Sequence, residues 1–395
     1  MAGRIEGHVK APASRRKGAS DMKSTAFIGI AVGSLGLLLW CCTTGEGPGP
    51  SPVIVSPEAS ATADVEATRV EAGPDTSGIP GYRIPDPNPY DSPTCHHPAL
   101  IPRCDERWCT LPKGCFLMGA PETEKRRSKF GEEQREVSFT HDLLIGKFET
   151  TQAEWKASGL PNGSRTDPDP ELVSDCLEDR CPVGNVSWFD TWIYANVLND
   201  REGLEHCAEP RQCMGTPGGG LHCTRIEQLV PDLYACKGYR LPTRAEYEYA
   251  ARGGTLMEFY SGPMTGIGEG PEYHLREVAW FTENSGHRTH PVGQKLPNHW
   301  GLFDILGNAG EWTTQEGYGL ANPEGPLVDW RGVLDPTDTS ALIRGGFGNA
   351  PPWGVRAGAR SLAGIRSGES PGLGFRLVRS LPNVLDSGLP DAGTD

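Results

Sequence analysis

The sequence predicts an α+β fold built from short strands, two amphipathic helices and long loops. The 395 residues include 51 Gly and 35 Pro and are only 37% hydrophobic, so much of the chain should be loop. Apolar residues alternate over short runs, and only two stretches show helical capping and periodicity. Of the twelve cysteines, all of which precede residue 237, the ten that follow Cys42 favour a fold stabilised by disulfides.

The N-terminus, residues 1–42, is predicted to be an export signal. A basic stretch precedes Ala26–Trp40, an uncharged apolar run of 15 residues, which is short for a membrane span and typical of a signal-peptide core. The run ends at Cys41 and Cys42 and resembles a bacterial lipoprotein signal, with either cysteine as the lipidated residue. Trp40 is larger than such signals prefer, so an uncleaved anchor is the alternative. Translation from Met22 would leave a compact signal. Both interpretations export the rest of the chain. The lipoprotein signal would place it in a bacterial cell envelope, as a periplasmic or outer-membrane lipoprotein.

Composition divides the remaining chain. Residues 43–94 are rich in Pro, Ser, Thr, Ala and Gly with few aromatics, and therefore predict a flexible linker that buries too little apolar surface to fold. The folded domain is expected at 95–381, and 382–395 should be a loose tail. The net charge of −14 is spread along the chain, which indicates no nucleic-acid partner.

The first half of the domain should contain two strands, at Val137–Thr140 and Leu143–Phe148, followed by a helix. Thr151 can cap that helix, with Glu154 completing a capping box. A loop should follow over 158–180.

The clearest helix is expected at Val186–Arg201, capped by Ser187 with Asp190 at its third position. Its apolar residues recur at helical spacing and should face the core: Phe189, Trp192, Ile193 and Val197. Residues 203–235 should form an excursion tied by disulfides.

A second capped helix should begin after Thr243, with Glu246 completing its box. Three short strands are expected after it, at Val278–Trp280, Leu342–Phe347 and Gly374–Val378.

The ten cysteines outside the signal are expected to form disulfides, because an even count in an exported chain without a paired Cys-x-x-Cys argues against zinc. Their connectivity is not readable from sequence, although the short spacing of Cys176 and Cys181 favours a local bond. The set is Cys95, Cys104, Cys109, Cys115, Cys176, Cys181, Cys207, Cys213, Cys223 and Cys236.

The segment Gly301–Trp312 combines small residues with two carboxylates, Asp304 and Glu311. Glycine-rich turns can aim backbone carbonyls at one point, and carbonyls beside carboxylates suit Ca²⁺. A buried turn with an ordinary ion pair is the alternative.

Three motifs in this order resemble the formylglycine-generating enzyme family, the sulfatase-modifying-factor domain. They are Gly238–Thr255 (GYRLPTRAEYEYAARGGT), Gly301–Trp312 (GLFDILGNAGEW), and Arg344–Phe347 (RGGF) with Gly372–Val378 (GLGFRLV). The resemblance runs from about Cys109 to Leu381. It implies a single irregular domain, a variant of the C-type-lectin fold with little regular structure, whose first strand is Gly114–Gly119.

Family enzymes oxidise a cysteine in a Cys-x-Pro-x-Arg stretch to formylglycine, using O₂ and Cu(I) held by two cysteines after the Arg-Gly-Gly-Ser motif. This chain has no cysteine after Arg344, so the resemblance implies no seat for copper. Phe347 stands at the family's serine, Gly310 at its tryptophan and Gly372 at its asparagine. The catalytic positions are therefore expected to be inactive. A related branch uses non-haem iron with an extra helical domain that this sequence does not show.

The resemblance also implies a structural calcium site. Its members would be Asp304, the carbonyls of Gly307 and Ala309, and the Glu311 side chain. Asn284 and Ser285 match only the start of another family calcium site, and the later partners of that site are missing. Arg240, Arg344 and Arg376 should pair with buried carboxylates such as Glu246.

The sequence therefore favours a non-oxidising binding module. Its groove would be lined by Phe347, Asn349 and Trp353, and its partner would be an extracytoplasmic protein, peptide or glycan, with the membrane reached through the N-terminal anchor. Oxidation of a protein cysteine by a non-standard site is the enzymatic alternative. A structural envelope component is the third.

Overall fold

The computed structural model describes residues 82–129, 131–167, 173–266, 271–314, 325–330, 334, 339–360 and 363–382. The predicted signal, the candidate lipidation sites Cys41 and Cys42, most of the linker and nearly all of the tail lie outside these residues. Within the described part of the chain, no helix has the length and apolar content needed to span a membrane.

The described residues begin before the predicted domain start. The Tyr82 hydroxyl donates to the carbonyl of Ser261 at 2.7 Å, and Asp91–Ser92 pairs with Cys95–His96. Residues 82–94 therefore pack with the domain, although their composition predicted linker. Proline and serine do not prevent a segment from lying against a surface formed by other parts of the chain.

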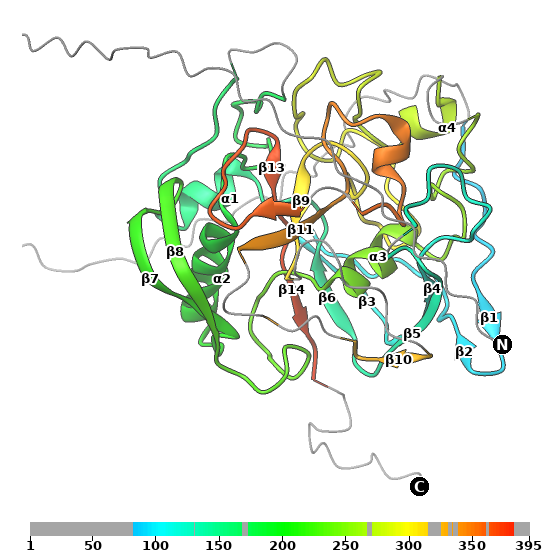
Figure 1. Ribbon diagram of the computed structural model, residues 1–395, viewed down its shortest axis with the longest axis horizontal. Coiled ribbons are helices and arrows are strands. Elements are labelled where there is room, and N and C mark those ends of the chain that lie inside the picture. Colours follow the sequence, from blue (N-terminus) through cyan, green and yellow to red (C-terminus); the bar gives the residue numbers. More distant parts are fainter. Residues whose placement is uncertain are drawn as a thin grey trace, which may run out of the picture. The chain divides into compact units, whose positions relative to one another are not determined.

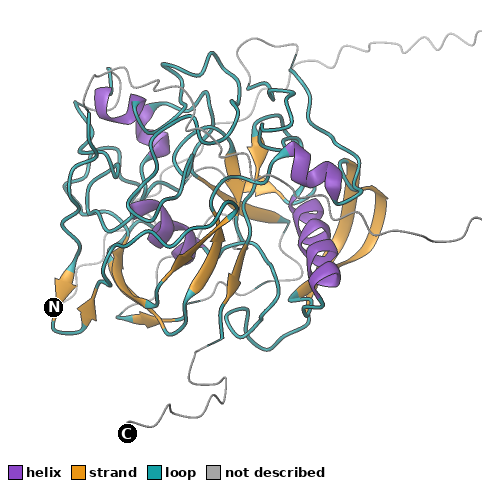
Figure 2. Cartoon of the chain, turned by 180° about the vertical axis from the view of Figure 1, so that it is seen from behind, coloured by secondary structure: helices purple, strands orange, loops and turns teal. Residues whose placement is uncertain are grey.

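The helices and strands are short, as expected, and most residues lie in loops (Figures 1 and 2). The helical elements are α1 (Gln152–Ala157), α2 (Trp188–Glu202), α3 (Arg244–Arg252), α4 (Tyr273–Arg276) and the 3-10 turn η1 (Pro352–Val355). The strands are β1 (Asp91–Ser92), β2 (Cys95–His96), β3 (Trp108–Leu111), β4 (Gly114–Met118), β5 (Arg135–Phe139), β6 (Leu143–Gly146), β7 (Ala208–Thr216), β8 (Gly219–Gln228), β9 (Gly310–Trp312), β10 (Leu327–Val328), β11 (Ser340–Arg344), β12 (Ala363–Ile365), β13 (Leu373–Gly374) and β14 (Val378–Ser380).

The strands form three small sheets and two hairpin pairs. The sheet orders are β12-β11-β9-β13, β10-β5-β4 and β14-β6-β3, and the pairs are β1-β2 and β7-β8. The first sheet carries two of the family-like motifs side by side, because β9 pairs with both β11 and β13. Segments more than 60 residues apart in sequence thus meet at the candidate site.

The predicted helix starts are confirmed. Thr151, Ser187 and Thr243 each cap a helix, and in each case the acidic residue three positions later completes the capping box. The short polar side chains satisfy backbone N–H groups that the first turn leaves without partners. Helix α2 ends at Gly203, whose φ of 66° is the left-handed conformation that favours glycine.

Three expectations about strands are wrong. Trp280 makes only a single bridge, to Gly307, instead of ending a strand. Strand β11 ends at Arg344, because Gly345 and Gly346 turn the chain with φ of 82° and 84°. The last predicted strand is divided between β13 and β14, which belong to different sheets.

The region 203–235 forms the β7-β8 hairpin, a long pair that the sequence analysis described only as an excursion. The hairpin packs alongside α2 at the left of Figure 1. The Cys213–Cys223 disulfide links its two strands at opposed positions.

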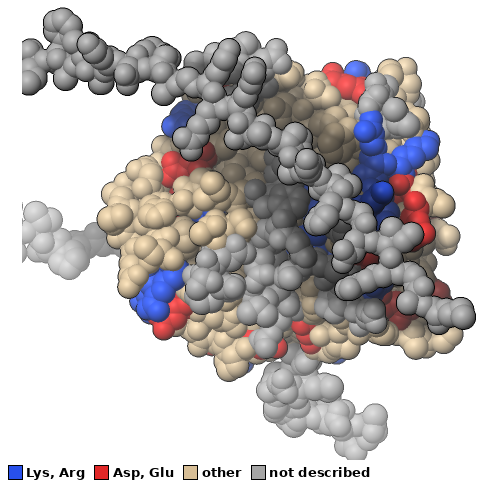
Figure 3. Space-filling view, viewed as in Figure 1, with Lys and Arg blue, Asp and Glu red and all other residues tan. Residues whose placement is uncertain are grey.

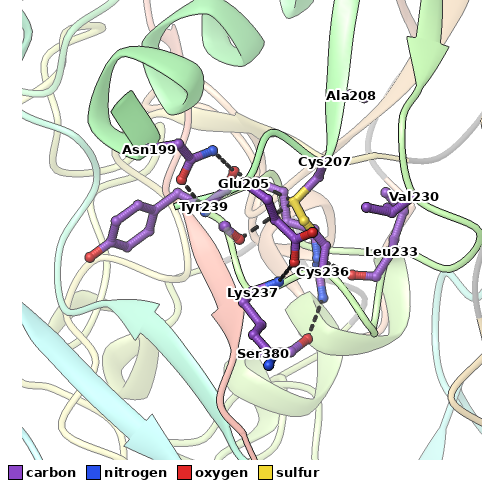
Figure 4. Close-up of a disulfide and its surroundings, with 12 residues drawn as sticks. Asn199, Glu205, Cys207, Ala208, Val230, Leu233, Cys236, Lys237, Tyr239 and Ser380 are labelled. Carbon is purple, nitrogen blue, oxygen red and sulfur yellow. Dashed lines mark hydrogen bonds between the residues drawn. A yellow bond between two sulfur atoms is a disulfide. The ribbon is translucent and has the colours of Figure 1, made fainter. Parts of the chain in front are cut away.

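All ten predicted cysteines are in disulfides, including the local Cys176–Cys181 bond. The other bonds are Cys95–Cys115, Cys104–Cys109, Cys207–Cys236 and Cys213–Cys223. Cys207–Cys236 is fully buried. Beside it, the Asn199 side chain of α2 accepts from the Tyr239 N–H at 2.6 Å and donates to its carbonyl at 3.1 Å (Figure 4). The Cys207–Cys236 disulfide therefore ties the start of β7 to the segment that leads into α3.

Candidate functional site

The predicted groove residues lie on one wall of a cavity of about 440 Å³. Phe347, Asn349 and Trp353 all line it, although they were chosen from the motif alone. Trp353 is 39% exposed, a large exposed area for an aromatic side chain. The turn η1 places it at the cavity edge, since Pro352 opens that turn.

The Phe347 ring occupies the space that a side chain at position 310 would need. A β-carbon on Gly310 would lie 2.8 Å from both Cε1 and Cζ of the Phe347 ring, closer than carbon atoms pack. The phenyl ring thus covers the position at which the family tryptophan would begin. The two replacements are therefore one coupled change of packing, and they close this corner with an apolar ring.

Gly372 continues the same site. Its carbonyl accepts from the Gly310 N–H at 2.9 Å, and its own N–H donates to the buried Asp175 carboxylate at 2.7 Å. With φ of 73°, and with Val173 2.3 Å from any β-carbon, it leaves no room for a side chain. Burial raises the pKa of Asp175 to about 6. An asparagine at position 372 would overlap the Val173 side chain in this arrangement.

The cavity offers no ligands for a soft metal. Its lining contains no cysteine, histidine or methionine, and Cu(I) selects sulfur. The ten cysteines of the domain are paired in disulfides, so they supply no thiolate. The residues present do not fit a copper centre.

Three arginines that the sequence analysis did not assign to the cavity also line it: Arg126, Arg356 and Arg360. Arg356 is 3% exposed and pairs with two buried carboxylates, Glu124 and Glu132. Its guanidinium also donates at 3.0 Å to the carbonyls of both Trp353 and Arg126. One buried cation therefore fixes the tryptophan turn and the basic loop in relation to each other. The run Lys125–Lys129 was the available signal, but the sequence does not show where that loop packs.

The predicted calcium residues lie in a buried cluster with excess negative charge. Glu149, Asp304 and Glu311 are each at most 1% exposed, and Arg376 is the cation paired with Glu311, at 2.8 Å. Burial and the neighbouring carboxylates raise the pKa of Glu149 well above its ordinary value. Burial also raises the pKa of Asp304, to about 6.

The fit of calcium to this cluster rests on Asp304. Its Oδ2 accepts from the Gly293 N–H at 2.7 Å, whereas Oδ1 is buried without a hydrogen-bond partner. Both Glu311 oxygens already accept from Arg376. No three His, Cys, Asp or Glu side chains in the described part of the chain are arranged to hold a metal. A Ca²⁺ ion here would therefore rely on Asp304 and on carbonyls such as those of Gly307 and Ala309.

Asn284 and Ser285 form hydrogen bonds within the protein. The Asn284 side chain accepts from the Phe281 N–H at 2.9 Å and donates to the Ala279 carbonyl at the same distance. The Ser285 hydroxyl donates to the Gly348 carbonyl at 2.5 Å, next to Phe347. Ser285 thus holds the backbone between the cavity residues Phe347 and Asn349.

The expectation that Arg240, Arg344 and Arg376 pair with buried carboxylates is confirmed. Arg240 contacts Glu246 at 2.7 Å, and all their side-chain atoms are buried. Arg344 contacts Glu248 at 3.1 Å, in addition to the Arg376–Glu311 pair. Bidentate guanidinium geometry suits such buried positions. These arginines are structural and do not form an anion site.

A family model described as the sulfatase-modifying factor enzyme 1-like domain matches residues 102–381. This chain belongs to that family. Among curated members, the chaperone protein LppX of Paenibacillus barcinonensis is 30% identical over 227 residues, which cover 52% of this chain and 72% of LppX.

Two further relatives differ in activity by their names, one being called an enzyme and the other inactive. The formylglycine-generating enzyme of Mycobacterium tuberculosis is 33% identical over 147 residues, covering 32% of this chain and 47% of that enzyme. The inactive C-alpha-formylglycine-generating enzyme 2 of Bos taurus is 32% identical over 117 residues, covering 28% and 37%. The chain thus matches less than half the length of both proteins.

Solved structures agree with the family fold. Treponema denticola variable protein 1 superposes with a TM-score of 0.51 at 27% identity, over 68% of this chain and 95% of that chain. PvdO from Pseudomonas aeruginosa gives 0.53 at 24% identity, over 69% and 94%, and supports the fold alone. The family and the irregular, disulfide-stabilised fold predicted from the motifs are confirmed.

Proposed function

We propose that this protein is an exported, membrane-anchored binding module that holds a segment of another extracytoplasmic protein in the Phe347–Trp353 cavity without oxidising it. The observation that carries the proposal is the replacement of the catalytic corner by a packed phenyl ring over Gly310. The cavity remains large enough for side chains of a peptide, and its exposed tryptophan offers an apolar contact.

The relatives favour a protein ligand over a glycan. LppX is named a chaperone protein, and it is similar to this chain over most of its length. Mammalian relatives named inactive indicate that the family includes members without the oxidase reaction. An aromatic rim alone would suit a sugar ring as well, so glycan binding is an outcome that the test must separate.

The test measures whether the purified protein prevents aggregation of unfolded exported proteins. Light scattering during refolding should fall when the parent protein is added, and Trp353→Ala should lose most of the effect. Tyr273→Ala is the matched control, because Tyr273 is an aromatic residue 59% exposed outside the cavity. Equal protection by both variants, or competition by oligosaccharides alone, would count against protein binding at this cavity.

The enzymatic alternative is favoured by the relatives named formylglycine-generating enzyme. Incubation with a Cys-x-Pro-x-Arg peptide, Cu(I) and O₂ tests it by mass spectrometry. We expect unchanged peptide, because the cavity supplies no sulfur ligand. Conversion of the cysteine to an aldehyde would replace the binding proposal with a catalytic one.

Anchoring is tested by changing Cys41 and Cys42 to Ser, together and singly. If one of them carries lipid, the single variant at that position should move the protein from the membrane fraction to the soluble fraction. Membrane association that persists in the double variant would favour the uncleaved anchor.

We also propose that calcium, where present, stabilises the Asp304 turn and has no catalytic role. The supporting argument is that the buried cluster holds three carboxylates and one arginine, which is paired with Glu311, so that a bound cation would offset the remaining negative charge.

A further inference from the structure

The charges around the cavity indicate what its ligand must carry. Two acidic side chains beside it, Glu124 and Glu132, are 9% and 2% exposed, and both pair with Arg356. Arg126 and Arg360 also line the cavity, in an exposed and a half-buried position. The described lining therefore carries three arginines and one glutamate.

The basic and aromatic parts of the wall form one surface. The Arg126 guanidinium lies 6.0 Å from the centroid of the Trp353 ring, within the range of a cation–π contact. Arg356 fixes this arrangement by donating to the backbone carbonyls of both residues. A ligand that reaches Trp353 must therefore pass close to a fixed positive charge.

This positive wall departs from the rest of the molecule. The chain carries a net charge of −14, yet the largely exposed segment Lys125–Lys129, which follows Glu124, contains two lysines and two arginines. Figure 3 shows Lys and Arg gathered on the right of one face of the molecule, with Asp and Glu beside them. A cleft whose wall carries more charge of one sign than of the other favours ligands of the opposite sign.

We propose that the cavity recognises an extended segment in which an apolar or aromatic residue lies next to Asp or Glu side chains, and that it disfavours the arginine-bearing segment on which the family's oxidases act. This inference rests on the proposed function and specifies its ligand class. The apolar residue packs between Phe347 and Trp353, and the carboxylate faces Arg126 and Arg360.

The test uses three fluorescein-labelled peptides with identical frames, acetyl-X-Leu-Phe-Pro-X-amide, where X is Glu, Gln or Arg. Blocking both ends removes the terminal charges, so only side-chain carboxylates remain. Fluorescence anisotropy with the full-length protein should show binding about tenfold tighter for the Glu peptide than for the Arg peptide at low ionic strength, with the difference shrinking as salt is added.

Two charge variants separate the cavity from the overall charge of the protein. Arg126→Glu should abolish or reverse the preference, whereas Lys237→Glu makes the same change of net charge at an exposed residue that does not line the cavity, and should keep it. Arg126→Gln should give an intermediate preference. Trp353→Ala should weaken all three peptides by a similar factor. Melting curves check that each variant is folded.

The outcomes distinguish the two proposals. Equal or tighter binding of the Gln or Arg peptide, still sensitive to Trp353→Ala, would overturn the acidic-ligand inference and leave the binding module standing. A Glu preference that Lys237→Glu removes as fully as Arg126→Glu would also overturn it. No Trp353-dependent binding of any peptide would overturn both.

Discussion

At the scale of single residues, the departures from the family motif are connected. The Phe347 ring packs where a side chain at position 310 would lie, and the Gly310 N–H donates to the Gly372 carbonyl. Sequence comparison counts three separate replacements, but packing makes them parts of one rearrangement. A single reversal toward the enzyme sequence should therefore be harmful.

Gly310→Ala should lower the free energy of unfolding by about 1–3 kcal/mol, because its β-carbon would overlap the Phe347 ring. In Gly310→Ala/Phe347→Ala the overlap disappears, so the double variant should be more stable than the sum of the single effects predicts. Urea unfolding of the four proteins measures this coupling. Additive effects within error would show that the ring moves aside without cost.

Asp304 provides the cleaner test of calcium. Added Ca²⁺ should raise the melting temperature of the parent, and Asp304→Asn should remove most of that rise while keeping an oxygen for the Gly293 N–H. Asp175→Asn is the matched control: it is also buried and has a raised pKa, but does not belong to the predicted set. A calcium response that survives Asp304→Asn would place the ion elsewhere.

Glu311 is unsuitable for that purpose. Its replacement by Ala leaves the buried Arg376 without its carboxylate, which should cost about 3–5 kcal/mol whether or not calcium binds. Chelator sensitivity in this variant would be confused with general loss of stability.

At the scale of elements, the disulfides compensate for short helices and strands. The Cys207–Cys236 bond closes a separation of 29 residues around the β7-β8 hairpin, whereas Cys213–Cys223 closes 10 inside it. The longer loop loses more entropy when it is closed in the unfolded chain. The outer bond also lies in the core, so the two bonds should differ in importance.

Replacing both Cys207 and Cys236 with Ala should destabilise the protein by about 3–4 kcal/mol, the loop-entropy estimate for this separation. The corresponding Cys213/Cys223 variant should lose about 2–3 kcal/mol, because its loop is shorter and Cys213 is exposed. Denaturant midpoints under non-reducing conditions provide the comparison. A larger loss for the hairpin bond would reverse the order and contradict the entropy argument.

At the scale of the whole molecule, stability should depend on pH through buried carboxyls. Burial raises the pKa of Asp175, Asp190 and Asp304 to about 6, from an ordinary value of 3.8. Each group favours the folded state when protonated: its contribution is complete below about pH 3.8 and is lost as the pH rises through 6. Half-buried histidines with lowered pKa, such as His97 and His290, act in the opposite direction.

A comparison with Asp304→Asn isolates one of these groups. In chelator, lowering the pH from about 8 to about 5 should change the unfolding free energy of the parent more favourably than that of the variant. Parallel pH profiles of the two proteins would indicate that Asp304 stays ionised throughout. Calcium should reduce the difference, since a bound cation favours the ionised carboxylate.

The sequence alone determined the family, the helix starts, the disulfide-forming cysteines and the expectation that three arginines pair with buried carboxylates, without naming each partner. These follow from local patterns. Thr243 and Glu246, three residues apart, form a capping box that marks a helix start, and three motifs in a fixed order are specific to one fold. It also placed Phe347, Asn349 and Trp353 near one another, since they lie within a few residues.

Only the tertiary structure decided what surrounds them. It showed the Phe347 ring packed on Gly310. It brought Arg126 to Trp353 through the buried Arg356, which lies more than 200 residues away from the Arg126 loop in sequence. It also paired Glu311 with Arg376, so that the Glu311 carboxylate is already engaged. Such contacts depend on how loops close over long separations, which residue spacing does not encode. The charge and shape of a binding cavity are therefore properties of the packing, whereas its location is a property of the motif.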